Sequence, residues 1–191
     1  MSRTQEVTPA RPEPARSPGT LWPTGSAWPA WPAWPDGRIL IRRPGGGDLA
    51  GLRDFLSGLS AQTRYLRFFA GVPASAAMLR ILAGQRPDAD ALVATRNGVI
   101  IGHAMAVDTA GPPAAAATEI GVVVADAWQG KGVGSRLVRA LASRARARGA
   151  TTLVMEVMAE NQRVLAMIAR RWPDASHDRS AAYVTVHTRL G

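Results

Sequence analysis

The 191-residue sequence contains no cysteine, which excludes disulfide bonds, thiolate metal sites and catalysis by a cysteine nucleophile. Its three histidines, His103, His177 and His187, are too far apart in the sequence to suggest a metal-binding motif. No apolar run reaches the ~18 residues of a membrane span, and the amino-terminal region lacks the apolar core of a signal peptide. We therefore expect a cytoplasmic protein that needs neither a metal nor a membrane partner.

Lysine is nearly absent too, since Lys131 is the one lysine among 23 basic residues. The formal net charge is +9, and residues 1–36 add nothing to it because their three arginines balance three acidic residues. Five arginines fall on one predicted helix: Arg136, Arg139, Arg144, Arg146 and Arg148. We expect either a solvated helix face or a surface that attracts an anionic cofactor. A nucleic-acid-binding module would explain the charge but none of the motifs below, so we expect no nucleic-acid partner.

The amino-terminal segment, residues 1–36, differs in composition from the rest. It holds eight of the 14 prolines and four of the six tryptophans, which predicts a disordered extension. Residues 27–35 repeat tryptophan and proline every third position, so Trp28, Trp31 and Trp34 would share one edge of a polyproline II helix. Such a repeat is either low-complexity sequence or a docking strip. Residues 37–191 are long and apolar enough for one α/β domain with a full core.

Residues 37–191 alternate strand and helix patterns. Strands are predicted at 38–42, 91–96, 99–107, 118–125, 152–157 and 182–189. Helices are predicted at 48–59, 60–69, 75–82, 134–149 and 160–171. Asn97-Gly98 is the strongest two-residue hairpin signal and joins the second and third strands. We expect four antiparallel strands, then a helix that returns the chain to a parallel fifth strand, with a ligand where strands four and five part.

A glycine-rich segment connects the fourth strand to the helix that follows it: Gln129, Gly130, Lys131, Gly132, Val133, Gly134 and Ser135. Free N–H groups at such a helix start, together with the helix dipole, favour a phosphate. The spacing excludes a dinucleotide fingerprint, whose third glycine would fall on Ser135 or Leu137. It also excludes a mononucleotide loop, since Ala125 and Gly132 stand at its required glycine and hydroxyl positions. The segment is therefore a pyrophosphate cradle or a plain tight connection.

With its Gln-x-x-Gly-x-Gly pattern, this segment resembles the signature of the GNAT superfamily of acetyl-CoA-dependent N-acetyltransferases. Residues 161–165, Asn-Gln-Arg-Val-Leu, resemble a later motif of that family. Residues 59–69 and 118–121 resemble the corresponding segments of its bacterial Pat-type protein lysine acetyltransferases. The resemblance covers roughly residues 38–191. It implies a mixed α/β, GNAT-like fold, with strands one to four antiparallel and strands four and five splayed around acetyl-CoA.

The resemblance also assigns roles to particular residues. The backbones of Val122, Val123 and Val124 would pair with the pantetheine amides, as if the cofactor were an added strand. The loop from Gln129 to Ser135 would hold the pyrophosphate, mainly through main-chain N–H groups. Asn161 would contact the pantetheine arm, unless it only begins a helix.

Glu119 stands where the Pat-type branch carries its catalytic glutamate. It would act as general base in a direct attack of the amine on the thioester. Its apolar neighbours predict partial burial, which would strengthen it as a base.

The sequence departs from the family pattern at two places, the position of the proton donor for the leaving thiolate and the final loop. Ile168 stands where many members place a tyrosine that protonates the leaving thiolate, so Tyr183 or a water would have to serve instead. Residues 171–173, Arg-Trp-Pro, replace a usual Gly-Phe pair, which predicts a rebuilt final loop.

The sequence thus favours an acetyl-CoA:amine N-acetyltransferase, acting as a monomer or homodimer. Its acceptor would be a protein lysine or a small-molecule amine. A non-catalytic acyl-CoA-binding sensor is the alternative.

Overall fold

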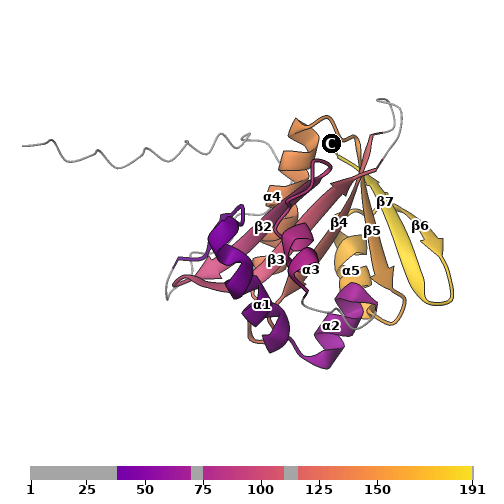
Figure 1. Cartoon of the computed structure of the whole chain (residues 1–191). Helices are drawn as coiled ribbons and strands as arrows, with labels where there is room; N and C mark the ends of the chain where they lie inside the picture. The colour runs from indigo at the N-terminus through magenta and orange to yellow at the C-terminus, as the bar shows by residue number, and fades with distance from the viewer. Residues whose placement is uncertain (1–37, 70–74, 110–115, 191) are drawn as a thin grey trace, which may run out of the picture. The chain divides into compact units, whose positions relative to one another are not determined.

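The computed structural model describes residues 38–69, 75–109 and 116–190, and these form a mixed seven-stranded sheet in the order β1-β2-β3-β4-β5-β7-β6 (Figure 1). The strands are β1 (Leu40–Arg42), β2 (Ala89–Arg96), β3 (Val99–Asp108), β4 (Ala117–Val124), β5 (Thr152–Met158), β6 (Ser176–Arg179) and β7 (Tyr183–Arg189). Neighbouring strands are antiparallel except β4 and β5, which run parallel. The antiparallel order of β1 to β4 and the parallel pairing of β4 with β5 are as the sequence predicts. The predicted tail, residues 1–36, lies outside the described residues, and its docking strip stays a prediction.

Helices cover both faces of the sheet. One face carries α1 (Leu49–Gly58), α2 (Ala61–Phe68) and α3 (Ala76–Leu82), and the other carries α4 (Val133–Ala147) and α5 (Gln162–Arg171) (Figure 1). Ser60 and Ser75 cap α2 and α3, each accepting a hydrogen bond from the backbone N–H three residues on. Short 3₁₀ turns precede α1 (Gly46–Asp48) and α4 (Asp126–Trp128). The predicted helices and strands agree with these bounds to within two residues at each end.

Two hydrophobic clusters follow from side-chain alternation along the strands. Leu137 and Leu141 of α4 and Ile168 of α5 pack on one face, against residues such as Leu153 and Ile120 of the sheet. Leu52, Phe55 and Leu79 pack on the other face, against Val93, Met105 and Val123 among others. Alternate residues of β4 therefore belong to different clusters. The position of a residue along the strand decides which face of the sheet its side chain occupies.

The β2–β3 hairpin turns at Asn97 and Gly98, which have φ angles of 49° and 81°. Positive φ at both central residues is what a type I′ turn requires, so the hairpin signal in the sequence is confirmed. Strand β6 was not predicted. Its sequence, Ser-His-Asp-Arg, lacks apolar alternation, and each of its side chains is exposed. It forms by pairing with β7 rather than by covering a core.

The parallel pairing of β4 with β5 is short. It runs from Ala117 to Glu119 on β4 and from Thr152 to Val154 on β5. Strand β4 continues to Val124 along β3, and β5 continues to Met158 along β7. The two strands thus part after Glu119, as expected, and beyond that point neither facing edge pairs with another described strand.

Candidate active site

The edge of β4 beyond Glu119 presents backbone groups that no described strand pairs. The N–H of Ala125 donates to β3, and the C=O of Ala116 accepts from the residue just before β5. Since successive residues direct their backbone groups to opposite edges, Val122 and Val124 face the side of β5. The backbone of Val123 is instead directed to β3, and its side chain is buried. The structure therefore leaves two of the three predicted valines, Val122 and Val124, to line the gap.

The glycine-rich loop ends in a helix start with no side-chain cap. Gly130 and Gly132 have φ angles of 74° and 79°, a conformation that glycine adopts without strain. Gly132 is the N-cap of α4 and contributes no capping side chain. The backbone N–H groups of residues 130–135 donate no hydrogen bond to the described part of the chain. Unpaired N–H groups at the positive end of a helix dipole form a site suited to a phosphate.

Asp126 fixes the base of this loop to α2. Its carboxylate accepts hydrogen bonds from the Ser60 N–H at 3.0 Å, the Ser60 hydroxyl at 2.7 Å and the Thr63 hydroxyl at 2.7 Å. These bonds, that from the Ser60 backbone first, lower the pKa of Asp126 to about 2. The loop that carries the free N–H groups is therefore held by a helix on the other face of the sheet.

Gln129 makes hydrogen bonds within the loop that the sequence did not predict. Its N–H donates to the Asp126 carbonyl at 3.2 Å, and its side-chain amide donates to Thr63 Oγ1 and the Val124 carbonyl. Gln129 thus shapes the loop from within, and its contact with a phosphate stays a prediction. The side chain of Val133 is buried under α4 as well, so only its N–H faces the loop.

Cationic side chains surround the loop. Lys131 Nζ lies 5.0 Å from the centroid of the Trp128 ring, and the Arg96 guanidinium also lies 5.0 Å from it. Arg163 of α5 reaches the loop from across the gap, because a Cβ atom on Gly130 would lie 2.9 Å from Arg163 Nη2. No pattern in the sequence indicates this contact, because it depends on how α5 packs. Arg163 is exposed and forms no ion pair with the residues that the structure describes.

Asn161 is the N-cap of α5, and its Oδ1 accepts a hydrogen bond from the Val164 N–H at 3.3 Å. The plain interpretation of this residue as a helix start is thus correct. Its side-chain Nδ2 has no partner within the described ranges, so one donor is left for a ligand in the gap. The predicted contact with the cofactor stays a prediction.

Glu119 is the last residue of β4 that pairs with β5, at the point where these two strands begin to part. Its side chain is exposed, so the predicted partial burial is wrong. The reason is strand alternation: Thr118 and Ile120 point into the core beneath α4, whereas Glu119 points to the face of α2. Three of the four apolar neighbours that suggested burial, Ile120, Val122 and Val124, therefore lie on the opposite face from the carboxylate, and only Val123 shares its face.

A second charged group, Arg67 of α2, occupies the same face. A Cβ atom on Gly121 would overlap its guanidinium, so Arg67 lies directly over β4, two residues beyond Glu119. Burial lowers the pKa of Arg67, and the negative charge of Glu119 opposes that change. Sequence reasoning placed Arg67 in a resembling segment but gave it no role.

The two departures from the family pattern differ in their outcome. Ile168 is buried in the core and supplies no proton donor. Tyr183 is partly exposed at the start of β7, and its ring lies 6.3 Å from that of Phe69 at the end of α2. After Trp172, the chain forms the β6–β7 hairpin, so the predicted change in the final loop coincides with the strand that was missed.

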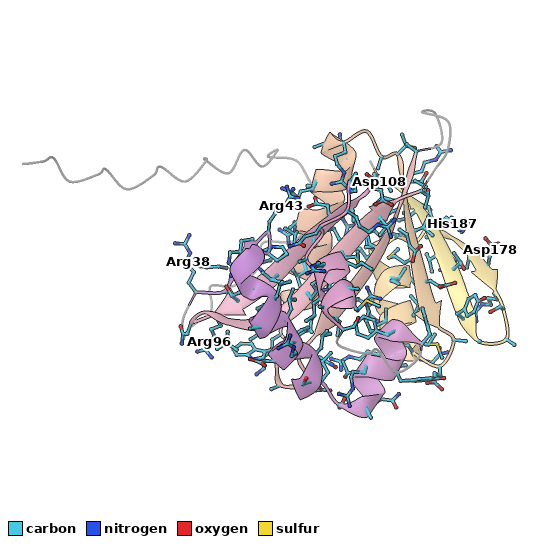
Figure 2. All side chains as sticks on the ribbon, in the orientation of Figure 1. Arg38, Arg43, Arg96, Asp108, Asp178 and His187 are labelled. Carbon is cyan, nitrogen blue, oxygen red and sulfur yellow. The ribbon has the colours of Figure 1, made fainter. Side chains whose placement is uncertain are left out.

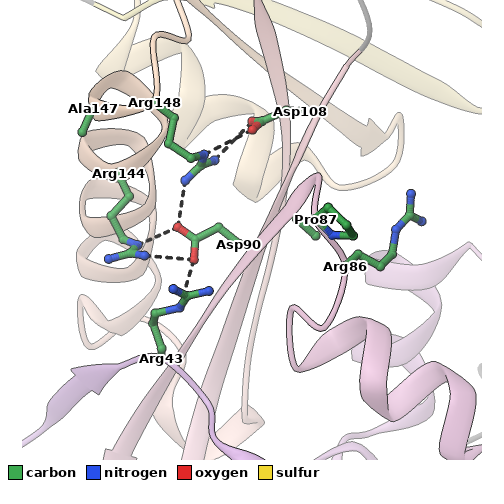
Figure 3. Close-up of a pocket in the computed structure, with 9 residues that line it drawn as sticks. Arg43, Arg86, Pro87, Asp90, Asp108, Arg144, Ala147 and Arg148 are labelled. Atoms are coloured by element: carbon green, nitrogen blue, oxygen red, sulfur yellow. Dashed lines mark hydrogen bonds and ion pairs between the residues drawn. The ribbon is translucent and has the colours of Figure 1, made fainter.

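The far end of α4 is closed by ion pairs. Arg144 Nε and Arg148 Nη1 lie 2.6 and 2.8 Å from Asp90 Oδ2, and Arg43 Nε lies 3.5 Å from Oδ1 (Figure 3). Arg148 also binds Asp108, and its hydrogen bonds lower the pKa of that carboxyl group. Arg144 and Arg148 are partly exposed, in keeping with the predicted solvated helix face, but they also form ion pairs that the sequence did not predict.

The start of α4, with its unpaired N–H groups, is called the free end below, and the other end, with these ion pairs, is called the closed end. The two ends lie far apart on the sheet. Figure 2 labels Arg96, which contacts the ring of Trp128, and Asp108, which binds Arg148, at opposite ends of the β2–β3 hairpin. Within the described ranges, no helix is long and apolar enough to cross a membrane. In the same ranges, no group of three His, Asp or Glu side chains is placed to hold a metal ion.

Comparison with known proteins relates this geometry to one family. The sequence model described as "Acetyltransferase (GNAT) family" matches residues 59–171. No curated protein matches the sequence. Among solved structures, the GNAT domain of S. lividans PAT is similar at a TM-score of 0.70 and 26% identity, over 79% of this chain and 90% of that one.

Two further structures share the fold. An N-acetyltransferase from Staphylococcus aureus Mu50 is similar at a TM-score of 0.65 and 20% identity, over 81% of this chain and 99% of that one. The acetyltransferase yncA from Salmonella typhimurium, solved with acetyl-CoA, is similar at a TM-score of 0.62 and 19% identity, over 81% of this chain and 95% of that one.

Proposed function

The chain belongs to the acetyltransferase (GNAT) family, and from this premise we propose that it moves the acetyl group of acetyl-CoA to a primary amine. It is an acyltransferase of the N-acetyltransferase class. The observation that carries the proposal is the row of unpaired N–H groups at residues 130–135, beside the unpaired edge of β4. One site favours a diphosphate and the other favours the amides of an extended arm, and coenzyme A contains both groups.

The residues at the gap divide the binding of acetyl-CoA between them. The N–H groups of residues 130–135 would hold the diphosphate, with Arg163 adding positive charge beside Gly130. Val122 and Val124 would pair with the pantetheine amides, and Asn161 Nδ2 would donate to a carbonyl of the same arm. The yncA protein, which shares this fold at 19% identity, was solved with acetyl-CoA, which supports the same ligand here.

Amide formation requires a neutral amine. A lysine side chain has a pKa of roughly 10.4 in solution, so a general base must remove a proton at neutral pH. Glu119 is the base in this proposal, because it is an exposed carboxylate at the point where the strands part. The amine nitrogen attacks the thioester carbon, the C–S bond breaks, and the proton passes to Glu119. Since a thiol has a pKa of about 8.5, the thiolate can leave unprotonated despite Ile168.

Two acceptor classes fit this chemistry. A protein lysine is supported by the segments that resemble Pat-type enzymes and by the S. lividans PAT domain at 26% identity. A small-molecule amine would use the same base and the same cofactor site. The acceptor is the part of the proposal that the family alone leaves open.

The test measures release of free CoA from acetyl-CoA with a thiol reagent, in the presence of lysine-containing peptides, folded proteins and small amines. The chain has no cysteine, so the protein itself adds no thiol signal. Calorimetry with coenzyme A tests the cradle separately. Failure to bind coenzyme A would refute the proposal. Binding without turnover on any acceptor would instead favour a non-catalytic acyl-CoA sensor.

The role of Glu119 is tested by Glu119→Gln, which keeps the shape of the side chain but cannot accept the proton. We expect kcat to fall roughly 100-fold or more, with the Kd for acetyl-CoA nearly unchanged. Asp54→Asn removes an exposed carboxylate from α1 and is the matched control. Equal activity of Glu119→Gln and the control would show that Glu119 is not the base.

A further inference from the structure

The guanidinium of Arg67, on α2, has no part in the proposed mechanism. It lies over Gly121 of β4 and 4.9 Å from the centroid of the Phe68 ring. Its Nε is closed off from solvent and has no hydrogen-bond partner. The two Nη groups have no partner among the described residues either, but solvent reaches them. The end of the guanidinium is therefore free to bind an anion.

Several other arginines that lie near a carboxylate differ from Arg67 in this respect. Arg42, Arg86, Arg144 and Arg148 each form a salt bridge with an aspartate. Arg67 forms none with any carboxylate that the structure describes. A partly desolvated cation without a partner is unfavourable for stability, so its position suggests a role other than holding the fold together.

Gly121 makes this position possible. Glycine weakens the interior of a strand, and here any larger residue would displace the guanidinium. Glu119 and Gly121 are two residues apart on β4 and so share one face. The Glu119 carboxylate and the Arg67 guanidinium thus lie near each other on that face without forming a salt bridge. Each is available to a charge on a third molecule.

From this pair of charges, and resting on the proposed acetyl transfer, we infer that the acceptor is a small amine that also carries a carboxylate a few bonds from the nitrogen. The Nη groups of Arg67 bind the carboxylate, for which the planar guanidinium offers two parallel N–H donors. Glu119 then receives the ammonium end and accepts its proton. An amine without a carboxylate would leave the Arg67 cation unpaired beside the incoming ammonium.

The experiment compares acceptors that differ only in the carboxylate. The pairs are 3-aminopropionate with propylamine, 4-aminobutyrate with butylamine, and α-amino acids with their decarboxylated amines, at one pH and by CoA release. We expect kcat/KM to be roughly 10- to 100-fold higher for the carboxylate member of the best pair, as for a charge-assisted hydrogen bond. Lysine peptides with neutral and acidic neighbours are assayed alongside.

Arg67→Met keeps much of the apolar side chain but removes the charge. It should bring the ratio within the best pair to about one, mainly by raising KM for the carboxylate member, while the Kd for acetyl-CoA stays constant. Arg67→Lys should retain part of the preference, because the charge stays but the two-donor geometry is lost. Arg53→Met removes an exposed arginine from α1 and should leave the ratio at its wild-type value.

Several results would overturn the inference and still leave acetyl transfer intact. One is equal activity on both members of every pair in the wild-type protein. Another is a higher kcat/KM for lysine peptides irrespective of neighbouring charge. A third is an Arg67→Met variant that loses kcat equally on all acceptors with a shifted pH profile, since Arg67 would then act on Glu119. If Arg67→Met does not fold, the wild-type comparison alone decides.

Discussion

The two ends of α4 differ in how their polar groups are satisfied. Each helix terminus has backbone groups without partners in the helix and a partial charge from the helix dipole. At the start, Gly132 caps the helix without a side chain, and the N–H groups before and after it stay free. At the end, Arg144 and Arg148 are bound by Asp90 and Asp108, and cations there also favour the helix dipole (Figure 3). The charges at the end of α4 are paired within the fold, whereas the N–H groups at its start, where we propose that the diphosphate binds, have no partner among the described residues.

The largest effect should follow from breaking the free end with Gly132→Val. Gly132 has a φ of 79°, a region that costs an L-residue about 1–2 kcal/mol and a β-branched one more. The loop should leave this conformation and its N–H groups should disperse, so the Kd for coenzyme A should rise roughly 100-fold, since each tenfold is about 1.4 kcal/mol. Calorimetry measures the change.

Gly149→Val is the matched control for that variant. Gly149, just beyond the closed end of α4, has a φ of 95° and no atoms near its missing side chain. It should lower thermal stability but leave the Kd for coenzyme A unchanged. A similar loss of affinity in both variants would show that general damage to α4, and not the loop conformation, explains the first result.

The closed end should respond to Asp90→Asn in stability and not in binding. The carboxylate of Asp90 is buried and receives three arginines, so its removal leaves Arg144 and Arg148 poorly paired. We expect the free energy of unfolding to fall by about 2–3 kcal/mol, less than for fully buried pairs because both arginines are a third exposed or more. Urea unfolding measures this. A raised Kd for coenzyme A in the folded variant would contradict the comparison.

Arg163→Gln should sharpen the description of the free end. The exposed guanidinium beside Gly130 would attract a phosphate without being part of the loop. Its loss should raise the Kd for coenzyme A roughly fivefold, as for about 1 kcal/mol of exposed charge pairing. The difference from wild type should shrink as salt is added. Arg170→Gln, an exposed arginine of the same helix, should change the Kd little.

The smallest effect is expected from Asp126→Asn, which weakens the attachment of the loop to α2. Hydrogen bonds lower the pKa of Asp126 from 3.8 to about 2 in the folded protein, so the unfolded chain binds the proton more readily. The stabilisation is therefore complete above pH 4 and is lost as the pH falls towards 2. Because Asp126 is exposed, we expect a difference below about 1 kcal/mol.

Unfolding curves of wild type and Asp126→Asn across this pH range test the sign. The gap in stability should be constant from neutral pH down to about pH 4 and should close below it. A gap that widens in acid would mean that the carboxylate destabilises the folded protein.

Local patterns in the sequence predicted the fold because its elements are locally determined. Ser60 and Ser75 cap the helices they precede, and Asn97-Gly98 forms the predicted turn. The glycines at 130 and 132 adopt the conformations that glycine favours, in the loop where the phosphate site was expected. Strand β6 was missed because it has no apolar pattern and exists only through pairing with β7.

The errors at the site have one physical origin, the three-dimensional neighbours of each residue. The apolar neighbours of Glu119 predict partial burial, but most of them, Ile120 among them, point to the other face, and Glu119 itself is exposed. The backbone of Val123 faces β3 rather than the gap, which depends on the register of the pair. Arg67 and Arg163 approach glycines far away in the sequence, and no spacing rule could bring them there.

The bonds of Asp126 to Ser60 and Thr63 also bear on how the two substrates bind. They join the loop proposed for the diphosphate to the helix that carries Arg67. A ligand that restrains this loop also restrains α2, so we expect acetyl-CoA and the acceptor to bind cooperatively. Thermodynamic reciprocity then requires that saturation with acceptor tighten the affinity for acetyl-CoA by the same factor.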